Sequence, residues 1–580
     1  MKRSIMRPSR RRPAVLASVL LASALFALEP LQFEDGFTFR VRDGRAHIAG
    51  FPARSEVTLP LTLGGKPVAG CEERYIRYAT LEPMTFRLQE GDQAFALIEG
   101  VLYSRDRKTL IRYPVSRRER TFAVPAGTER IAAGAFTGAV GLTAVTLPQG
   151  LRLIGHEAFA RTGLTTLTCP DSLTELGEKA FADTPLASVT LSSGLRELPR
   201  GLLLNCRRLA SLQLPSSLER IGDMAFLGCV SLASVTLPEG LRSIGVSAFG
   251  DCRSLATVRL PSSLASLGRE AFSGCAALSA LEVAPGNATF QATHGVLFEP
   301  GAATLVRFPP ASPLTEYSVP GRITALAAGA FADCAQLKAV TLPPGLVEIG
   351  DRAFRRGPTP TPQASGELTL PETLRRIGVE AFAHTGLAGE LTLPAAVAEL
   401  GAYAFFQSRL TGLDASRTAL RTWPYGVLEG SQALQWCRLP AGLTEVGEAS
   451  FYGCRSLTEV TLPTGVRRVK SRAFARCASL KGVELPNGLA SIGESAFAGC
   501  TALSEIIFPN TVSEMGAQAF EGCSSLIAVG LPRSLTAVRR GTFRNCASLT
   551  AVSVPPSVRR IDPTAFEGCP KLEPPPSVAP

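Results

Sequence analysis

Residues 232–252 read LASVTLPEGLRSIGVSAFGDC, and most of the chain after residue 120 consists of copies of this stretch. The next copy opens 23 residues later, at Leu255, with the same order of apolar residues, proline, glycine, phenylalanine and cysteine. A fixed period in the twenties is typical of a solenoid, in which stacked units bury one another's apolar faces. Phenylalanine, or leucine in its place, marks eighteen copies, at positions 136, 159, 181, 203, 226, 249, 272, 331, 354, 382, 405, 428, 451, 474, 497, 520, 543 and 566.

Each copy begins with a short apolar run that predicts a β-strand. Leu232, Val235 and Leu237 are expected to point inward from one parallel sheet that all units share. Pro238 follows at once, and because proline has no N–H to donate, it marks the end of the strand. The pattern therefore predicts a mostly β solenoid with one parallel sheet, short 3₁₀ or helical turns and a period of 23 residues.

The return half of each copy predicts a turn and a stacked aromatic row. Gly245 predicts a backbone turn at this point, of a kind that a side chain would hinder. Ala248 and Phe249 are expected on a short helical or 3₁₀ turn, with each phenylalanine stacked between its counterparts in adjacent units. The predicted structural ladder comprises Phe226, Phe249, Phe272, Phe451, Phe474, Phe497, Phe520 and Phe543.

The consensus L-x-x-V-x-L-P-x-x-L-x-x-I-G-x-x-A-F-x-x-C resembles the BspA-like, or Treponema-type, leucine-rich repeat over residues 91–573. The resemblance implies a right-handed, parallel β-rich leucine-rich-repeat solenoid. It also implies a bacterial or protozoal surface or secreted protein, of a kind linked to adhesion or to binding of host proteins. The family offers no shared catalytic residues to carry over to this chain.

The first 27 residues are typical of a secretory signal peptide, with six basic residues before the apolar run Ala14–Phe26. A single membrane anchor is the alternative, but the run is short for a bilayer span. We therefore expect export to the cell surface, periplasm or medium, with no integral membrane span after signal removal. Without those six basic residues the net charge of +11 falls to +5, which predicts no nucleic-acid partner.

Five segments depart from the regular period. Residues 28–90 contain hairpin signals and predict an N-terminal β cap, with a separate binding or catalytic module as the alternative. Two matching long units, 91–136 and 286–331, each predict an extra hairpin that projects from the solenoid wall and alters its curvature. The Pro- and Thr-rich insertion at 355–366 predicts an exposed loop, and residues 574–580 form a Pro-rich tail.

The cysteines and histidines predict neither a metal site nor an active site. Eleven of the fourteen cysteines lie three residues after the phenylalanine marker, where other units carry small residues such as Ala139 and Thr184. That position selects for size, no C-x-x-C occurs, and the thiols are expected to be unpaired. The four histidines lie in different units without a catalytic motif. We therefore expect no enzyme, no cofactor and no metal.

Six aromatic residues outside the regular row collect between residues 403 and 452, including both tryptophans of the chain. Trp436 falls at an outward strand position that other units fill with Ser234 or Thr257. Exposed aromatic rings commonly anchor binding surfaces, although packing around the irregular unit 406–431 would also explain the cluster. The predicted binding residues are Trp436, Arg438, Glu459, Trp423 and Tyr425.

Export, repeats and the family resemblance together predict a scaffold for protein recognition or adhesion at the bacterial surface, without catalysis. The expected partner is a protein or other macromolecule. One alternative is a structural surface component that associates with itself, and another is a hydrolase within residues 28–90.

Overall fold

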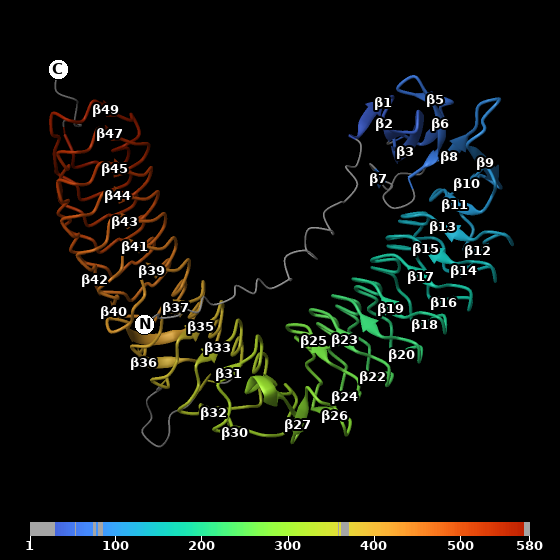
Figure 1. Ribbon diagram of the computed structural model, residues 1–580. Coiled ribbons are helices and arrows are strands. Elements are labelled where there is room, and N and C mark those ends of the chain that lie inside the picture. Colours follow the sequence, from blue (N-terminus) through green and yellow to red (C-terminus); the bar gives the residue numbers. More distant parts are fainter. Residues whose placement is uncertain are drawn as a thin grey trace, which may run out of the picture.

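The computed structural model describes residues 30–52, 54–72, 77–78, 85–357, 359–360 and 370–573. In these residues β-strands follow one another from β1 (Gln32–Glu34) to β49 (Arg560–Ile561), and the single helix is the 3₁₀ helix η1 (Pro300–Ala302). Figure 1 shows the units stacked side by side into an open arc with two limbs. The predicted mostly β, parallel-stranded solenoid is confirmed.

Most regular units contribute two short strands to the wall, and the units around residues 481–486 and 503–508 contribute only the inner one. We call the strands that carry the first apolar run outer strands, because they follow the outer edge of the arc in Figure 1. They are β12 (Thr121–Ala123), β14 (Ala144–Thr146), β16 (Thr166–Thr168), β18 (Ser188–Thr190), β20 (Ser211–Gln213), β22 (Ser234–Thr236), β24 (Thr257–Leu260), β26 (Ala280–Val283), β30 (Glu316–Ser318), β32 (Ala339–Thr341), β34 (Thr359–Pro360), β36 (Ala388–Thr392), β38 (Arg409–Asp414), β40 (Trp436–Arg438), β42 (Glu459–Thr461), β46 (Ala528–Gly530) and β48 (Ala551–Ser553).

The inner strands lie on the return segment of each unit, inside the arc. They are β13 (Arg130–Ile131), β15 (Leu153–Ile154), β17 (Glu175–Leu176), β19 (Glu197–Leu198), β21 (Arg220–Ile221), β23 (Ser243–Ile244), β25 (Ser266–Leu267), β31 (Ala325–Leu326), β33 (Glu348–Ile349), β35 (Arg376–Ile377), β37 (Glu399–Leu400), β39 (Thr422–Trp423), β41 (Glu445–Val446), β43 (Arg468–Val469), β44 (Ser491–Ile492), β45 (Glu514–Met515), β47 (Ala537–Val538) and β49.

Both sets of strands pair in parallel with the corresponding strands of neighbouring units. Outer strand β22 pairs with β20, and inner strand β23 pairs with β21 and β25. The prediction of one shared sheet is therefore incomplete, because a second ladder runs along the inside of the arc. A strand of two residues is too short to show the alternation of apolar and polar residues that identifies a strand in a sequence.

The turn that carries the phenylalanine is not helical. The N–H of Gly250 donates to the carbonyl of Ser247 within the turn, at 3.0 Å, whereas the N–H of Phe249 donates to Ala271 of the next unit, at 2.8 Å. Ser247 and Asp251 adopt left-handed φ angles of 50° and 54°, which a right-handed helix excludes. The predicted helical or 3₁₀ turn is wrong, because alternate N–H groups bond to the neighbouring unit.

The marker phenylalanines stack in rows at the spacing that the repeat predicts. Phe249 is fully buried, with its ring centroid 5.0 Å from that of Phe226 and 5.6 Å from that of Phe272. A second row has centroids 5.0–5.4 Å apart and comprises Phe451, Phe474, Phe497, Phe520 and Phe543. Each ring therefore packs on the units before and after its own.

Gly245 is required by close packing between units. Its φ angle is not among the left-handed ones, but a Cβ atom there would lie 2.5 Å from the backbone nitrogen of Asp223 in the preceding unit. Real Cβ atoms do not approach backbone atoms so closely. The glycine was predicted correctly, but the reason is the lack of space for a side chain and not the conformation of the turn. A glycine at this position therefore lets the return segments of neighbouring units pack directly against each other.

Where the position after the phenylalanine is cysteine, threonine or serine, its side chain also supplies a hydrogen-bond donor; Ala139 and Gly357 are the exceptions. Cys252 Sγ donates to the carbonyl of Phe226 at 3.3 Å, and Thr184 Oγ1 donates to that of Phe181 at 2.8 Å. The cysteines are free, and burial raises the pKa of Cys275 to about 12. Size alone does not describe this position, since a donor for the phenylalanine carbonyl is shared by cysteine, threonine and serine.

Residues before the first repeats form small sheets of their own. β2 (Phe37–Arg42) and β3 (Arg45–Phe51) form an antiparallel hairpin whose turn residues Asp43 and Gly44 both have positive φ, as a type I′ turn requires. The remaining strands here are β1, β4 (Glu56–Thr58), β5 (Thr62–Leu63), β6 (Lys66–Cys71), β7 (Arg77–Tyr78) and β8 (Thr85–Arg87). Their apolar core continues into Phe95 and Leu102 of the first long unit, which is consistent with the predicted cap.

Each long unit contains an antiparallel meander. The first comprises β9 (Phe95–Ile98), β10 (Val101–Ser104) and β11 (Thr109–Arg112), and the second comprises β27 (Gln291–Thr293), β28 (Val296–Glu299) and β29 (Thr304–Arg307). Their last strands join the inner ladder through β13 and β31. The extra hairpins do not project, because Val101, Leu102 and their counterparts Val296 and Leu297 are fully buried. The second long unit lies where the apolar core divides into two clusters.

Several predictions fall outside the described residues. The signal peptide at 1–27, the tail at 574–580 and most of the insertion at 355–366 belong to this group. Among the residues that are described, no helix has the length and apolar character needed to cross a bilayer.

Candidate binding surface

Four outer strands form the sheet that carries the predicted site. β36, β38, β40 and β42 pair in parallel in that order, and β36 and β38 are longer than the usual outer strands. The register places Trp436 between Gly412 and Glu459, and Arg438 between Asp414 and Thr461. The structure therefore brings three predicted residues together: Trp436, Arg438 and Glu459.

The indole of Trp436 lies across the neighbouring strand. A Cβ atom on Gly412 would overlap the ring, so the absence of a side chain there makes room for it. Trp436 Nε1 donates to Glu390 Oε1 of β36 at 3.3 Å, two strands away. The ring is half-buried, so it is held in one orientation while part of it stays open to solvent.

Arg438 lies over the same indole. Its guanidinium carbon is 5.3 Å from the ring centroid, within cation–π range, and its Nη1 lies 3.6 Å from Asp414 Oδ2. Partial burial disfavours the charged form of Asp414, but hydrogen bonds from Ser416 and the charge of Arg438 hold its pKa below the usual value. Asp414 is therefore ionised near neutral pH and orients the guanidinium.

Charge surrounds the indole on three sides. Glu390 accepts its N–H, Arg438 covers its face, and exposed Glu459 lies opposite it on β42. An apolar ring within a polar rim is the arrangement found at protein–protein hot spots. The surface can therefore offer an aromatic contact, two carboxylate acceptors and an arginine donor to one partner.

Trp423 does not belong to this surface. It is 1% exposed, and its ring stacks on Phe451 with centroids 6.2 Å apart. Leu428 replaces the marker phenylalanine in this unit, and the indole fills the volume in the row. The prediction that Trp423 contributes to binding is wrong, because the ring compensates for a missing core phenylalanine.

Tyr425 is exposed but separate from Trp436. It lies in the turn after β39, 42% exposed, and its ring packs edge-on against Tyr403 with centroids 5.0 Å apart. Burial, followed by a hydrogen bond with Tyr425, raises the pKa of Tyr403. The five predicted residues therefore divide into a surface triad, a core ring and a turn residue.

Three residues of the surface were not predicted: Glu390, Gly412 and Asp414. Gly412 carried a usable signal, because a glycine within a strand often marks the close approach of another group. Glu390 lies 46 residues before Trp436 and carries no local signal of that contact. Among the described residues no group of three or more acidic, histidine or cysteine side chains has an arrangement that could hold a metal ion.

Comparison with known proteins assigns the family. A family model for the BspA type leucine rich repeat region matches residues 119–233, 198–293, 308–360, 363–481 and 444–573. These matches cover more than half of the sequence, and the chain belongs to this family of leucine-rich-repeat proteins. No curated protein matches the sequence.

Solved structures of leucine-rich-repeat proteins are similar to this chain. A leucine rich cell surface protein from Faecalibacterium prausnitzii is 20% identical, with 78% of this chain and 94% of that one covered and a TM-score of 0.38. A leucine-rich repeat protein from Bacteroides ovatus is 23% identical, with 87% and 95% covered and a TM-score of 0.37. The pneumococcal vaccine antigen PcpA is 18% identical, with 84% and 94% covered and a TM-score of 0.33.

Proposed function

We propose that this chain is an exported recognition or adhesion scaffold that binds a protein at the bacterial surface through the sheet around Trp436. The family and the solenoid support a protein-binding scaffold. The observation that carries the location is the half-buried indole on an outward face, laid over Gly412 and covered by Arg438. No regular unit needs an indole at that position, since Thr257 and Glu459 fill it elsewhere.

Preorganisation favours this sheet as an interface. The hydrogen bond to Glu390 and the ion pair with Asp414 hold Trp436 and Arg438 in place before a partner arrives. Binding then costs less side-chain entropy than it would for free side chains. A tryptophan anchor in such a setting contributes about 2 kcal/mol or more, which corresponds to roughly thirtyfold in affinity.

The test replaces Trp436 with threonine, which fills equivalent outward positions. The full chain and the variant are passed over immobilised extracellular matrix and, separately, over immobilised copies of the same chain. We expect retention on the matrix to fall at least tenfold in Trp436→Thr, with an unchanged circular dichroism spectrum and melting temperature. The matched control is Ile507→Thr, which removes an 82% exposed apolar residue from a later unit and is expected to keep full retention.

The outcomes separate the alternatives. Equal loss of retention in both variants would mean that non-specific hydrophobic adsorption, and not this sheet, explains binding. A strongly lowered melting temperature in Trp436→Thr would assign the ring to the core. Retention on copies of the chain alone would favour a self-associating structural component. Protease treatment of intact cells tests export separately, since an exported chain is cleaved without lysis.

A further inference from the structure

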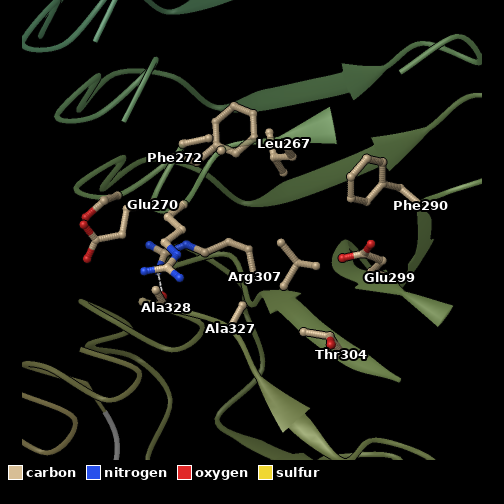
Figure 2. A pocket seen from close by; sticks show the side chains of 15 residues that line it. Leu267, Glu270, Phe272, Phe290, Glu299, Thr304, Arg307, Ala327 and Ala328 are labelled. Atoms are coloured by element: carbon tan, nitrogen blue, oxygen red, sulfur yellow. Dashed lines mark hydrogen bonds between the residues drawn. The ribbon is translucent and has the colours of Figure 1, made fainter. Parts of the chain in front are cut away.

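The regular stacking stops at the second long unit, and a cavity lies there. Phe272 stacks on Phe249 before the interruption, and the row begins again with Phe308 on Phe331, at 5.5 Å. A cavity of about 120 Å³ lies between the turn at 268–273 and the segments that carry Arg307 and Ala328. Figure 2 shows the side chain of Arg307 entering this space, with Glu270 and Glu299 on opposite walls.

Arg307 is buried with an incomplete set of partners. It is 5% exposed, and its Nη1 donates to the carbonyl of Gly329. Its Nε and Nη2 are buried and have no hydrogen-bond partner among the described residues. A buried charge with unsatisfied donors is costly unless something else in the cavity accepts those hydrogen bonds.

The wall carboxylates do not supply that acceptor. Glu270 is held by Arg352, whose Nη1 lies 3.2 Å from Glu270 Oε2, and none of the ion pairs among the described residues involves Arg307. The Nε and Nη2 atoms form the edge of a guanidinium that matches two oxygens of a carboxylate or phosphate. We propose that this cavity binds a small oxyanion, either a short carboxylate or inorganic phosphate, through that edge of Arg307.

The test is isothermal titration of the full chain with two probes, sodium acetate and inorganic phosphate. We expect saturable binding of one anion per chain. The probe that binds shows whether the natural ligand is a carboxylate or a phosphate. Arg307→Lys keeps the charge but removes the two-donor edge, and is expected to weaken binding at least tenfold. Ala328→Leu leaves Arg307 intact and fills the cavity, with the same expected loss. Arg269→Lys is the matched control on the exposed rim and is expected to bind like the native chain.

A charge variant tests the same site in the opposite direction. Glu299→Gln removes a negative charge from the wall and is expected to strengthen binding several-fold, because repulsion of the anion decreases. Folding of each variant is checked by circular dichroism. If Arg307→Lys does not fold, the affinity of Ala328→Leu decides whether the anion binds in the cavity. Absence of saturable binding of both probes to the native chain would overturn the proposal. Equal affinity of the native chain and Ala328→Leu would do so too.

Discussion

Truncation of Phe249 to alanine tests the energetics of the stacked row. The ring is fully buried and stacks on two neighbours, Phe226 and Phe272. Phenylalanine to alanine at a buried site costs about 3–5 kcal/mol. Because each aromatic pair contributes about 0.5–1.5 kcal/mol beyond area burial, loss of two pairs puts the expected cost at the upper end of that range.

The assay is hydrogen exchange followed by mass spectrometry, with peptides resolved along both limbs. Amide protection is expected to fall most in the units of Phe226, Phe249 and Phe272 and to stay unchanged beyond Phe451, because solenoid units contact only their neighbours. The matched control is Phe566→Ala, which loses one stacked pair, with Phe543, at a half-buried site. Uniform loss of protection along the whole chain, or a cost below about 1 kcal/mol, would refute the reasoning.

Three further predictions concern contacts between units. Gly245→Ala is expected to destabilise the first limb by about 1–3 kcal/mol in urea unfolding, because the new methyl group would meet the backbone of the preceding unit; an unchanged midpoint would contradict this. Cys252→Ala removes the Sγ donor to the carbonyl of Phe226 but leaves the N–H of Cys229 bonded to it; it is expected to cost up to about 1 kcal/mol more than Cys252→Ser, and equal midpoints would show that size alone matters. Cys569 is half-buried whereas Cys523 and Cys546 are buried, so Cys569 is expected to react first of these three with a thiol reagent at pH 8, and more slowly at lower pH because the thiolate is the reactive form; labelling that begins at Cys523 or Cys546 would contradict this.

The repeat period made most of the fold predictable. Phe226, Phe249 and Phe272 stack because identical spacing in sequence becomes identical height in a solenoid. The inner strands were missed because Ser243–Ile244 is too short to show a pattern, and their pairing depends on the neighbouring units. The helical turn was a wrong prediction because the N–H of Phe249 donates its hydrogen bond to Ala271 of the next unit. The sequence of one unit does not record a partner that lies in another.

The candidate site was predictable only where the repeat set an expectation. Trp436 could be identified because other units show what that position requires. Trp423 has the same residue type, and only the packed structure shows that it replaces the volume lost at Leu428. Glu390 approaches Trp436 from two units away, and no pattern within one unit records such a contact. A single sequence therefore does not predict which side chain fills a volume lost elsewhere in the core, nor which side chains meet between units.

Close stacking beside Gly245 has a consequence for how such a gene changes length. Each regular unit presents one face to the preceding unit and a matching face to the next, so an in-frame duplication of 23 codons within a limb inserts a rung that fits on both sides. On the side of the second long unit that faces the cavity at Arg307, the inner ladder ends at β25, and β29 pairs instead with β28 and β31, so a unit duplicated there would have no inner strand to pair with on that side. We therefore expect units to be gained and lost within the limbs and not at the second long unit. The limbs would then vary in length while the second long unit is retained.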